Sequence, residues 1–319
     1  MSQPTEVTTF QGFQRTVTHQ SVLYSVARRM GLDPTVNLIS NVASSYLSYI
    51  NERCREAWEM YDWSELLVQE QRPFSDVWNS IKTYSTGNIV YDFTSNSYYS
   101  ALSSVPANTP VTNGTYWLLA QPLQPLTVPR TGQINSSNTT YPELGTIFKV
   151  SSLDIFANQF APDVNFTVNA KGVNVWPLAQ TGVDSPVVLN NGTVTYPFLI
   201  FSTVFILYRQ PYPGFATDQF VSGTTYNIGD QVFSGTDTYT CTVNGTTAQP
   251  PSANWTLVPF PYFLSEFVKR ASYCDALVED GQHEKAQMEL PNAYSRLWNE
   301  YDKQNQQQGL TQYFSVVVR

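Results

Sequence analysis

The chain has 319 residues, a formal net charge of −8 and 13% charged side chains. Its length allows one or two domains that bury an apolar core without disulfides or metals. The acidic balance argues against a surface that grips duplex DNA, because phosphate binding needs clustered Lys and Arg. Aromatic residues make up 14% of the chain, and Thr, Ser, Asn, Tyr and Pro are abundant, which favours short strands and turns.

The cysteines and the apolar runs argue against metal-binding, disulfide-rich and membrane-spanning proteins. Cys54, Cys241 and Cys274 lie far apart and form no CxxC pair, so neither a zinc site nor a disulfide framework is predicted. No basic stretch followed by an apolar core opens the chain, and no run approaches the roughly 18 apolar residues of a membrane span. We therefore expect no metal, no cofactor, no membrane span, and assembly in a cytoplasm.

Two helices are predicted near the N-terminus. Apolar residues recur at helical spacing over residues 17–31, with Thr18 as a cap and Gly31 as a stop. Asp33-Pro34 is then typical of the cap and first residue of a second helix, which should run to about Trp63.

After the second helix, short β-branched and aromatic runs separated by Gly, Pro, Asn and Ser predict strands as far as about Pro261. Helical spacing returns at Phe263 and ends at Gly281. A last helix is predicted from about Glu284, and Pro291 inside it should kink or split it.

Two segments of the β region match each other. They share an aromatic residue, then Tyr-x-x-Gly-x-x-Val, then Tyr, Pro and Trp. The first copy runs through Trp78, Tyr84, Gly87, Val90, Tyr98, Pro110 and Trp117, and the second through Phe220, Tyr226, Gly229, Val232, Tyr239, Pro250 and Trp255. This similarity predicts two copies of one small β module, each with a turn at the Gly and a Trp that closes the core.

The repeat resembles the small chitin-binding or cellulose-binding modules attached to glycoside hydrolases, which share Tyr-x-x-Gly-Asp-x-Val. Residues 226–232 match this sequence closely, whereas the first copy has Asn88 at the Asp position. The resemblance implies that aromatic faces stack on sugar rings, and the alternative is that the same aromatics form the core of each module. The candidate sugar-contacting residues are Trp78, Tyr98, Trp117, Tyr239 and Trp255.

The two ends of the chain resemble the head-to-tail connector (adaptor) proteins in the neck of tailed bacteriophages. The similarity lies in the helical block 49–63, in the strand Leu207-Tyr-Arg with the Pro-rich turn after it, and in the block 276–308. The resemblance implies a ring of identical subunits, a dodecamer, docked under a portal protein. Tail or nozzle proteins would attach below, and genomic DNA would pass through the lumen.

The C-terminal extension, residues 306–319, has strand propensity after a polar run. It is expected either to dock on the portal protein by strand addition or to form the last strand of the chain's own sheet. The candidate docking residues are Tyr313, Phe314, Val316, Val317 and Val318.

Signatures of catalysis are scarce. The chain has two histidines, His19 and His283, and neither lies near a nucleophile motif, so both are expected on helix surfaces. No phosphate-binding loop occurs, and most carboxylates of the β region adjoin Pro, Ser, Thr or Gly in turn-like contexts. We therefore expect a protein that is not an enzyme.

These observations predict an α+β protein with a helical base and a long β insertion. Its predicted parts are the helical base at 12–67 and 259–305, module 1 at 74–122, a central β domain at 128–219 that carries both modules, module 2 at 220–258, and the extension at 306–319. The expected function is that of a structural virion protein at the neck, joining portal to tail. The alternative is a carbohydrate-binding decoration or fibre-associated protein that contacts host glycans.

Overall fold

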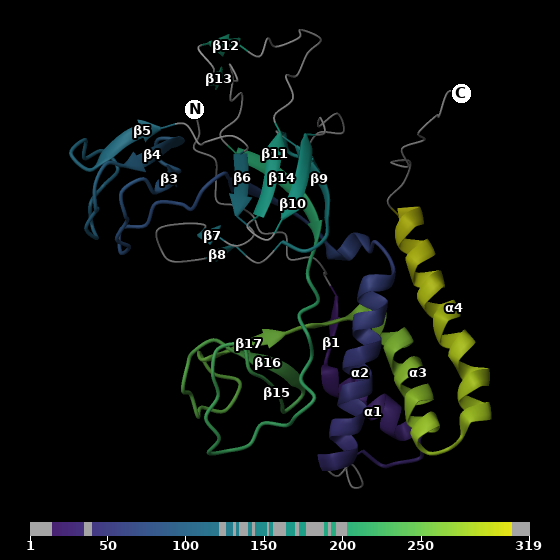
Figure 1. Ribbon diagram of the computed structural model, residues 1–319. Coiled ribbons are helices and arrows are strands. Elements are labelled where there is room, and N and C mark those ends of the chain that lie inside the picture. The colour runs from purple at the N-terminus through teal and green to yellow at the C-terminus, as the bar shows by residue number, and fades with distance from the viewer. Residues whose placement is uncertain are drawn as a thin grey trace, which may run out of the picture. The chain divides into compact units, whose positions relative to one another are not determined.

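The computed structural model describes residues 15–34, 40–120, 126–129, 132–133, 140–141, 144–151, 153–155, 164–169, 172–176, 188–190, 193–195 and 203–307. Within these ranges the chain forms four helices and several small antiparallel sheets, so the predicted α+β class is confirmed (Figure 1). None of the helices described is long and apolar enough to cross a membrane.

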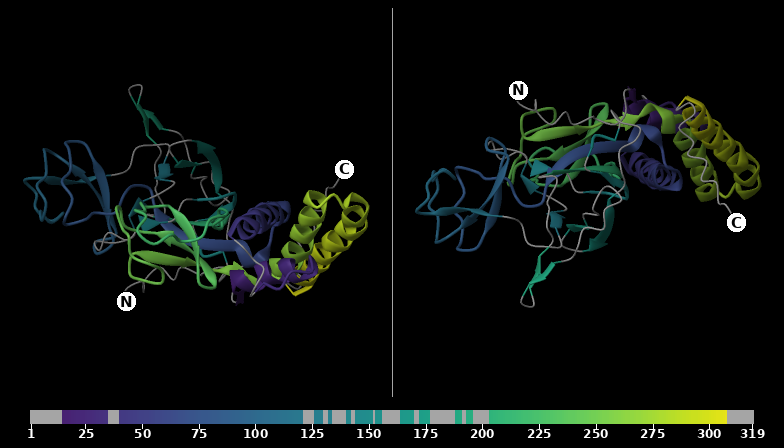
Figure 2. Two further views of the ribbon diagram at one scale, coloured as in Figure 1. Left: turned by 90° about the horizontal axis from the view of Figure 1, so that it is seen from below. Right: turned by 90° about the horizontal axis from the view of Figure 1, so that it is seen from above.

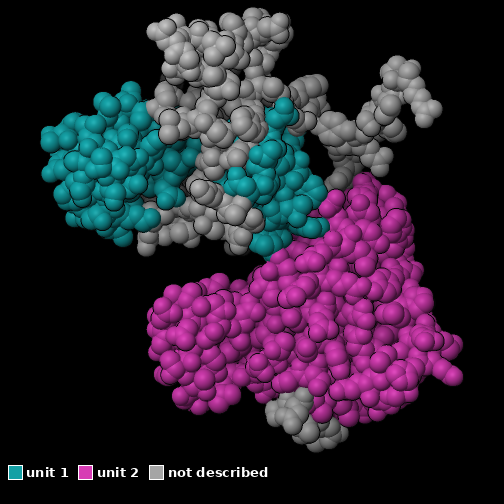
Figure 3. Space-filling model, viewed as in Figure 1, with its two compact units in different colours: residues 1–11, 67–211 teal, residues 12–66, 212–319 magenta. Residues whose placement is uncertain are grey.

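The chain divides into two compact units, each built from segments that are distant in the sequence (Figure 3). Unit 1 comprises residues 1–11 and 67–211, and unit 2 comprises residues 12–66 and 212–319. Unit 1 holds module 1 and the central β domain, whereas unit 2 holds the helices and module 2. The prediction that both modules project from the central β domain is therefore wrong for module 2.

The first helix and the turns that end two helices follow the predicted signals. Helix α1 spans His19–Arg29, and the Thr18 hydroxyl accepts a hydrogen bond from the Ser21 amide at 3.3 Å. Gly31 and Gly281, which follow α1 and α3, have φ angles of +82° and +77°. Only glycine adopts these angles without steric cost, which is why the helices end there.

Helix α2 spans Ser40–Met60, so it ends close to the predicted end at Trp63. The predicted start at Asp33-Pro34 cannot be followed through residues 35–39, which lie outside the described residues. Arg53 joins α2 to α3 through a pair of hydrogen bonds to Asp275, at 2.6 and 2.8 Å.

Helix α3 spans Tyr262–Glu279 and helix α4 spans His283–Gln307. Helix α4 continues through Pro291, so of the predicted kink or split, the split is wrong. Ala293 and Leu297 of α4 are buried in the core of unit 2, and this packing holds the segment after the proline in the same helix as the segment before it. Figure 2 shows α3 and α4 running beside each other.

Two three-stranded antiparallel sheets form the central β domain of unit 1 and share one apolar core. Val150, Val204 and Ile206 contribute to this core from one sheet, and Val128 and Val173 from the other. The strands, in sheet order, are β2 (Leu67–Pro73), β14 (Thr203–Arg209) and β9 (Ile147–Ser151), and β10 (Asn165–Asn169), β11 (Gly172–Trp176) and β6 (Leu126–Pro129).

A buried ion pair lies in this core. The Arg72 Nη2 atom is 2.6 Å from Glu70 Oε2, and the Tyr208 hydroxyl donates to Glu70 Oε1 at 2.8 Å. The Glu70 and Arg72 side chains are almost fully buried. Their mutual hydrogen bonds offset the cost of removing two charges from water. The segments around Glu70 and Tyr208 are paired strands, β2 and β14.

Smaller elements complete the described structure outside the two modules. They are β1 (Thr16–Val17) with β18 (Phe260–Pro261), β7 (Gly132–Gln133) with β8 (Thr140–Tyr141), β12 (Val188–Asn190) with β13 (Thr193–Thr195), and a 3₁₀ turn at Ser64–Leu66.

Candidate functional site

The predicted repeat is confirmed as two copies of one three-stranded antiparallel sheet. In module 1, Val90 lies opposite Tyr99, and in module 2, Val232 lies opposite Tyr239. The strands are β3 (Ile89–Asp92), β4 (Ser97–Ala101) and β5 (Trp117–Ala120) in module 1, and β15 (Gln231–Ser234), β16 (Asp237–Cys241) and β17 (Trp255–Val258) in module 2.

The strand register corrects one match that was made from the sequence. Tyr98 was matched with Tyr239, but the residue opposite Val90 is Tyr99, and the position equivalent to Tyr98 is Thr238. Adjacent residues of a strand point to opposite faces, so this shift of one residue moves Tyr98 to the other face of its sheet.

The turn before the first strand is the same in both modules. Gly87 has a φ of +85° and Gly229 a φ of +93°, angles that favour glycine. Asn88 Oδ1 accepts a hydrogen bond from the Ser85 amide at 2.8 Å. Asp230 Oδ2 accepts the equivalent bond from the Asn227 amide at 2.7 Å. Asn and Asp therefore serve equally well at this position, which explains how module 1 departs from the Gly-Asp pattern.

A Tyr-Trp pair closes each module. The ring centroids of Tyr84 and Trp117 are 5.3 Å apart with an interplanar angle of 68°, and Tyr226 and Trp255 have the same geometry. Trp255 Nε1 donates to the Ala248 carbonyl at 2.7 Å. Edge-to-face packing of this kind stabilises cores that are too small for aliphatic side chains alone.

Burial contradicts the predicted sugar-binding role for three of the five candidate residues. Only 5% of Tyr98, 3% of Trp117 and 6% of Trp255 is exposed, so their ring faces are covered by protein. Trp78 and Tyr239 are partly buried against the module cores. The alternative interpretation, that these aromatics form the core of each module, is confirmed for Trp117 and Trp255, whereas Tyr98 is buried in the core of the central β domain.

Each module packs on the rest of its own unit through the sheet face opposite its Tyr-Trp pair. In module 1, Tyr91 and Tyr98 join the core of the central β domain, and the Tyr98 hydroxyl accepts from the Phe74 amide at 2.9 Å. In module 2, Phe233 and Val258 join the core of the helices. The same sheet face therefore contacts two different partners within one chain.

His19 lies at the contact between α1 and module 2. Its Nδ1 atom is 2.8 Å from Thr238 Oγ1, and its ring packs against Phe215, Phe233 and Phe260 at centroid distances of 5.4 to 5.5 Å. Complete burial lowers the pKa of His19 from 6.5 to about 3. The prediction of a surface position is therefore wrong for His19, whereas His283 is exposed as predicted.

Module 2 also provides partners for the amide groups at the start of α1. The His19 amide donates to Asp237 Oδ1 at 3.0 Å, and the Gln20 amide donates to the Thr236 carbonyl at 2.8 Å. The first amides of a helix lack partners within the helix, and a carboxylate beside them is favoured by the helix dipole. These contacts are a further reason why module 2 belongs to unit 2.

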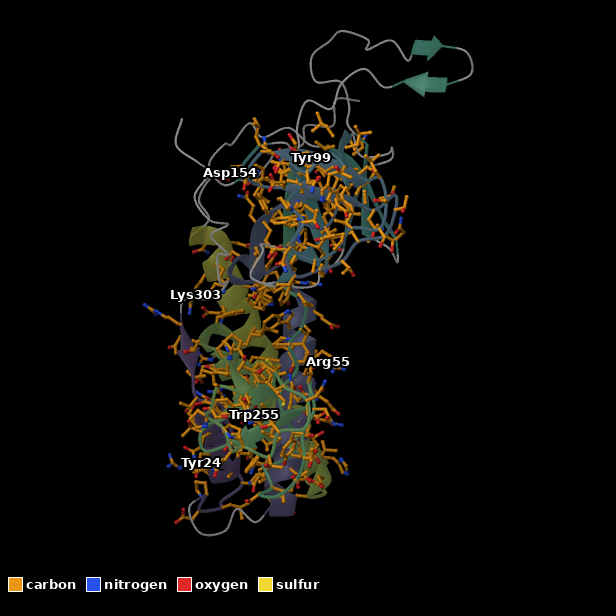
Figure 4. The ribbon with its side chains drawn as sticks, turned by 90° about the vertical axis from the view of Figure 1, so that its left-hand side faces the viewer. Tyr24, Arg55, Tyr99, Asp154, Trp255 and Lys303 are labelled. Carbon is orange, nitrogen blue, oxygen red and sulfur yellow. The ribbon has the colours of Figure 1, made fainter. Side chains whose placement is uncertain are left out.

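A groove of about 620 Å³ runs along module 2 beside α2. Phe220 and Tyr226 stack within it, with ring centroids 5.5 Å apart. Two carboxylates, Asp218 and Asp230, line the groove, and its lining contains no Lys or Arg. In the sequence, no Lys or Arg occurs between Arg209 and Lys269. The groove therefore has a negative potential and an aromatic wall. Figure 4 labels Trp255 of this module, and Tyr99 of module 1.

The helices of unit 2 carry a second exposed feature, which we call the aromatic patch and define as Tyr61, Trp298 and Tyr301. Tyr61 stacks on Tyr301 with a centroid distance of 4.5 Å, and Trp298 lies 5.9 Å from Tyr61. Trp298 is 54% exposed, and Tyr61 and Tyr301 are partly buried against the core. Helical spacing alone gave no sign that Trp298 is exposed.

The predicted portal-docking residues Tyr313, Phe314, Val316, Val317 and Val318 lie outside the described residues. Within the part of the chain that is described, no group of three or more His, Cys, Asp or Glu side chains is placed to hold a metal ion.

Two functional candidates, the groove and the aromatic patch, were missed by sequence reasoning. The long stretch without Lys or Arg was a visible sign of an acidic surface, but the groove itself forms only where residues 218–220 lie beside α2. Comparison of the chain with protein-family models, with curated proteins and with solved structures finds no match.

Proposed function

We propose that this protein is a structural virion component that forms a closed ring of identical subunits and joins a portal protein to the tail. The observation that carries the proposal is the aromatic patch on the helices of unit 2, where Trp298 is 54% exposed beside Tyr61 and Tyr301. Tryptophan and tyrosine are the residues on which protein interfaces depend most strongly. An exposed patch of them is typical of a surface that another protein covers.

The organisation of unit 2 supports the same proposal. Its helices come from both ends of the chain, and the core that they share buries Trp58 and Trp63 together with Phe263 and Phe267. Both chain ends are also the parts that resemble phage connector proteins. A rigid helical unit suits a ring, because each subunit must present two surfaces at a constant angle if the rotation is to close.

The patch is large enough to matter for assembly. A buried Trp side chain removes about 150 to 250 Å² from water, and about half of that area is still exposed in Trp298. Covering about 100 Å² of apolar surface contributes about 2.5 kcal/mol. An interface of standard size buries about 800 Å² on each partner, so Trp298 would be one anchor among several contacts.

Native mass spectrometry of the purified chain, alone and mixed with a candidate portal protein, tests the proposal. A ring, or a monomer that joins the portal in a fixed symmetric ratio, is the expected result. Trp298→Ala should weaken the assembly by about 2 kcal/mol, or about thirtyfold. Tyr262→Ala is the matched control, because Tyr262 is similarly exposed but lies outside the patch. A monomer indifferent to every portal tested would refute the proposal.

Contact with host glycans is the second candidate function. It is supported by two equivalent surface pairs, Tyr99 with Leu119 in module 1 and Tyr239 with Leu257 in module 2, in which both leucines are exposed. A partly exposed tyrosine beside an apolar side chain can stack on a sugar ring. Binding to insoluble polysaccharide that is lost in the Tyr99→Ala, Tyr239→Ala double variant would support this function. Binding that is unchanged in that variant, or no binding at all, would exclude it for these residues.

A further inference from the structure

We propose that the groove of module 2 binds a basic cluster on a neighbouring copy of this chain, so that the ring closes head to tail through these two surfaces. The basic cluster consists of Arg28 and Arg29 of α1 and Lys269 and Arg270 of α3. This inference rests on the proposed ring and names the contact that would close it.

The groove has the chemistry that recognises a guanidinium or ammonium group. Asp218 and Asp230 have no cationic side chain within 4 Å among the described residues, so no ion pair there occupies either carboxylate. Phe220, which is partly exposed, adds an aromatic ring beside them, whereas Tyr226 behind it is buried in the module core. Arginine binds such a combination well, because its planar group pairs with carboxylates and stacks on rings.

The basic cluster lies on a different part of the same unit. Arg28 and Arg29 are exposed in the last turn of α1. Lys269 donates to Glu266 at 2.8 Å, and this bond, with the charges of Lys269, Arg270 and Arg29, lowers the pKa of Glu266. Arg29, Lys269 and Arg270 are therefore neighbours of Glu266, and Arg28 precedes Arg29 in the last turn of α1, so the cluster keeps a net positive charge.

Two of the arginines keep their charge unpaired at the surface. Arg28 and Arg29 form no ion pair among the described residues, and the Nε atom of Arg270 is buried without a hydrogen-bond partner. Basic residues at the end of a helix interact favourably with the helix dipole, which accounts for the position of Arg28 and Arg29. That interaction leaves their guanidinium groups available to a carboxylate on another molecule.

A second copy of the chain is the partner that fits best. A ring needs two different, complementary surfaces on every subunit, and the groove and the basic cluster are complementary in charge. The chain as a whole is acidic, with 25 Asp and Glu against 17 Lys and Arg, so a net positive cluster stands out from the rest of its surface. Neither surface includes a residue of the other, so each subunit can use both at once.

Two variants, each damaging one surface, test the inference. The groove variant is Asp218→Asn with Asp230→Asn, and Asn88 of module 1 shows that Asn makes the same turn contact as Asp230. The cluster variant is Arg28→Gln with Arg29→Gln. The matched control is Glu284→Gln with Asp302→Asn, two exposed acids of α4 outside both surfaces. The mass of each is measured by sedimentation or native mass spectrometry at low and high salt.

Each damaging variant alone should be monomeric at concentrations where the unaltered chain and the control variant form rings. The association constant should fall at least about tenfold, as expected when a charge-assisted contact is lost. An equal mixture of the two variants should give a dimer and nothing larger, because one intact groove then meets one intact cluster. That dimer would also show that both variants are folded.

Three outcomes would overturn the inference. If both variants form rings as readily as the control, the ring stands and uses other surfaces. If the cluster variant forms rings but no longer retains duplex DNA, the cluster is a nucleic-acid contact. If the unaltered chain forms no ring, alone or with a portal, the proposed function fails together with the inference.

Discussion

The stability of unit 2 should fall in acid because of one buried histidine. His19 is completely buried against Phe215, Phe233 and Phe260, and only its Nδ1 atom has a polar partner, the Thr238 hydroxyl. A proton on this ring would bring a charge into an apolar site. Replacing His19 by a residue that does not titrate should therefore remove part of the acid sensitivity.

The magnitude follows from the difference between the folded and unfolded pKa values. In the folded protein the pKa of His19 is about 3, and in the unfolded chain it is near 6.5. Between these values the unfolded chain binds a proton that the folded protein does not. His19 therefore costs no stability above pH 6.5. Between pH 6.5 and pH 3 it lowers the free energy of unfolding by about 1.4 kcal/mol for each pH unit. At pH 5 the loss from His19 alone should be about 2 kcal/mol.

Urea unfolding at pH 7, 6 and 5 measures this loss. His19→Gln lacks the titrating group, so its free energy of unfolding should fall by about 2 kcal/mol less than that of the unaltered chain between pH 7 and pH 5. Its lower stability at pH 7 does not affect the comparison, which uses the slope. His283→Gln is the matched control, because the exposed His283 is the other histidine of the chain.

The reasoning would be refuted if His19→Gln and the unaltered chain showed the same pH slope. It would also be refuted if the His19 ring, followed by NMR in the folded protein, titrated near pH 6.5. Either result would mean that water or a polar group reaches Nε2 in solution, so that a charge on the ring is tolerated.

Three other replacements have defined outcomes. Arg72→Met should lower the free energy of unfolding of unit 1 by about 3 to 5 kcal/mol in urea titrations, because it leaves Glu70 as an uncompensated buried charge; a loss below 1 kcal/mol would contradict this. Trp255→Ala should cost about 3 to 5 kcal/mol by removing the largest ring of the module 2 core, measured by thermal or urea unfolding. Asp230→Asn should change stability by less than about 0.5 kcal/mol, since Asn88 makes the same turn contact in module 1, and a larger loss would show that the charge itself is needed.

The repeat shows how much of the fold could be predicted from local sequence. The Tyr-x-x-Gly-x-x-Val spacing identified both modules, because it specifies a turn at Gly87 or Gly229 and a strand after it. It misplaced Tyr98 by one residue, because strand partners are chosen by which faces are buried. Tyr98 packs into the core of the central β domain, which the module's own sequence does not describe.

The candidate sites likewise depend on contacts that local sequence does not describe. Charge composition alone indicated an acidic protein, but the groove depends on where residues 218–220 lie against α2, and the aromatic patch depends on how α4 meets the end of α2. His19 was indistinguishable from a surface residue by spacing, since its burial requires module 2 to cover the start of α1.

Local sequence patterns were enough to predict several elements: the capped helix α1, the glycine after α3, and two copies of a module whose core a Trp closes. These depend on backbone conformations and side-chain spacings within a few residues of each other. Which unit each module joins, which aromatic rings are buried and where charges stay exposed became visible only in the folded chain. Those outcomes depend on the matching of apolar faces between segments far apart in the chain, and local preferences do not encode that matching.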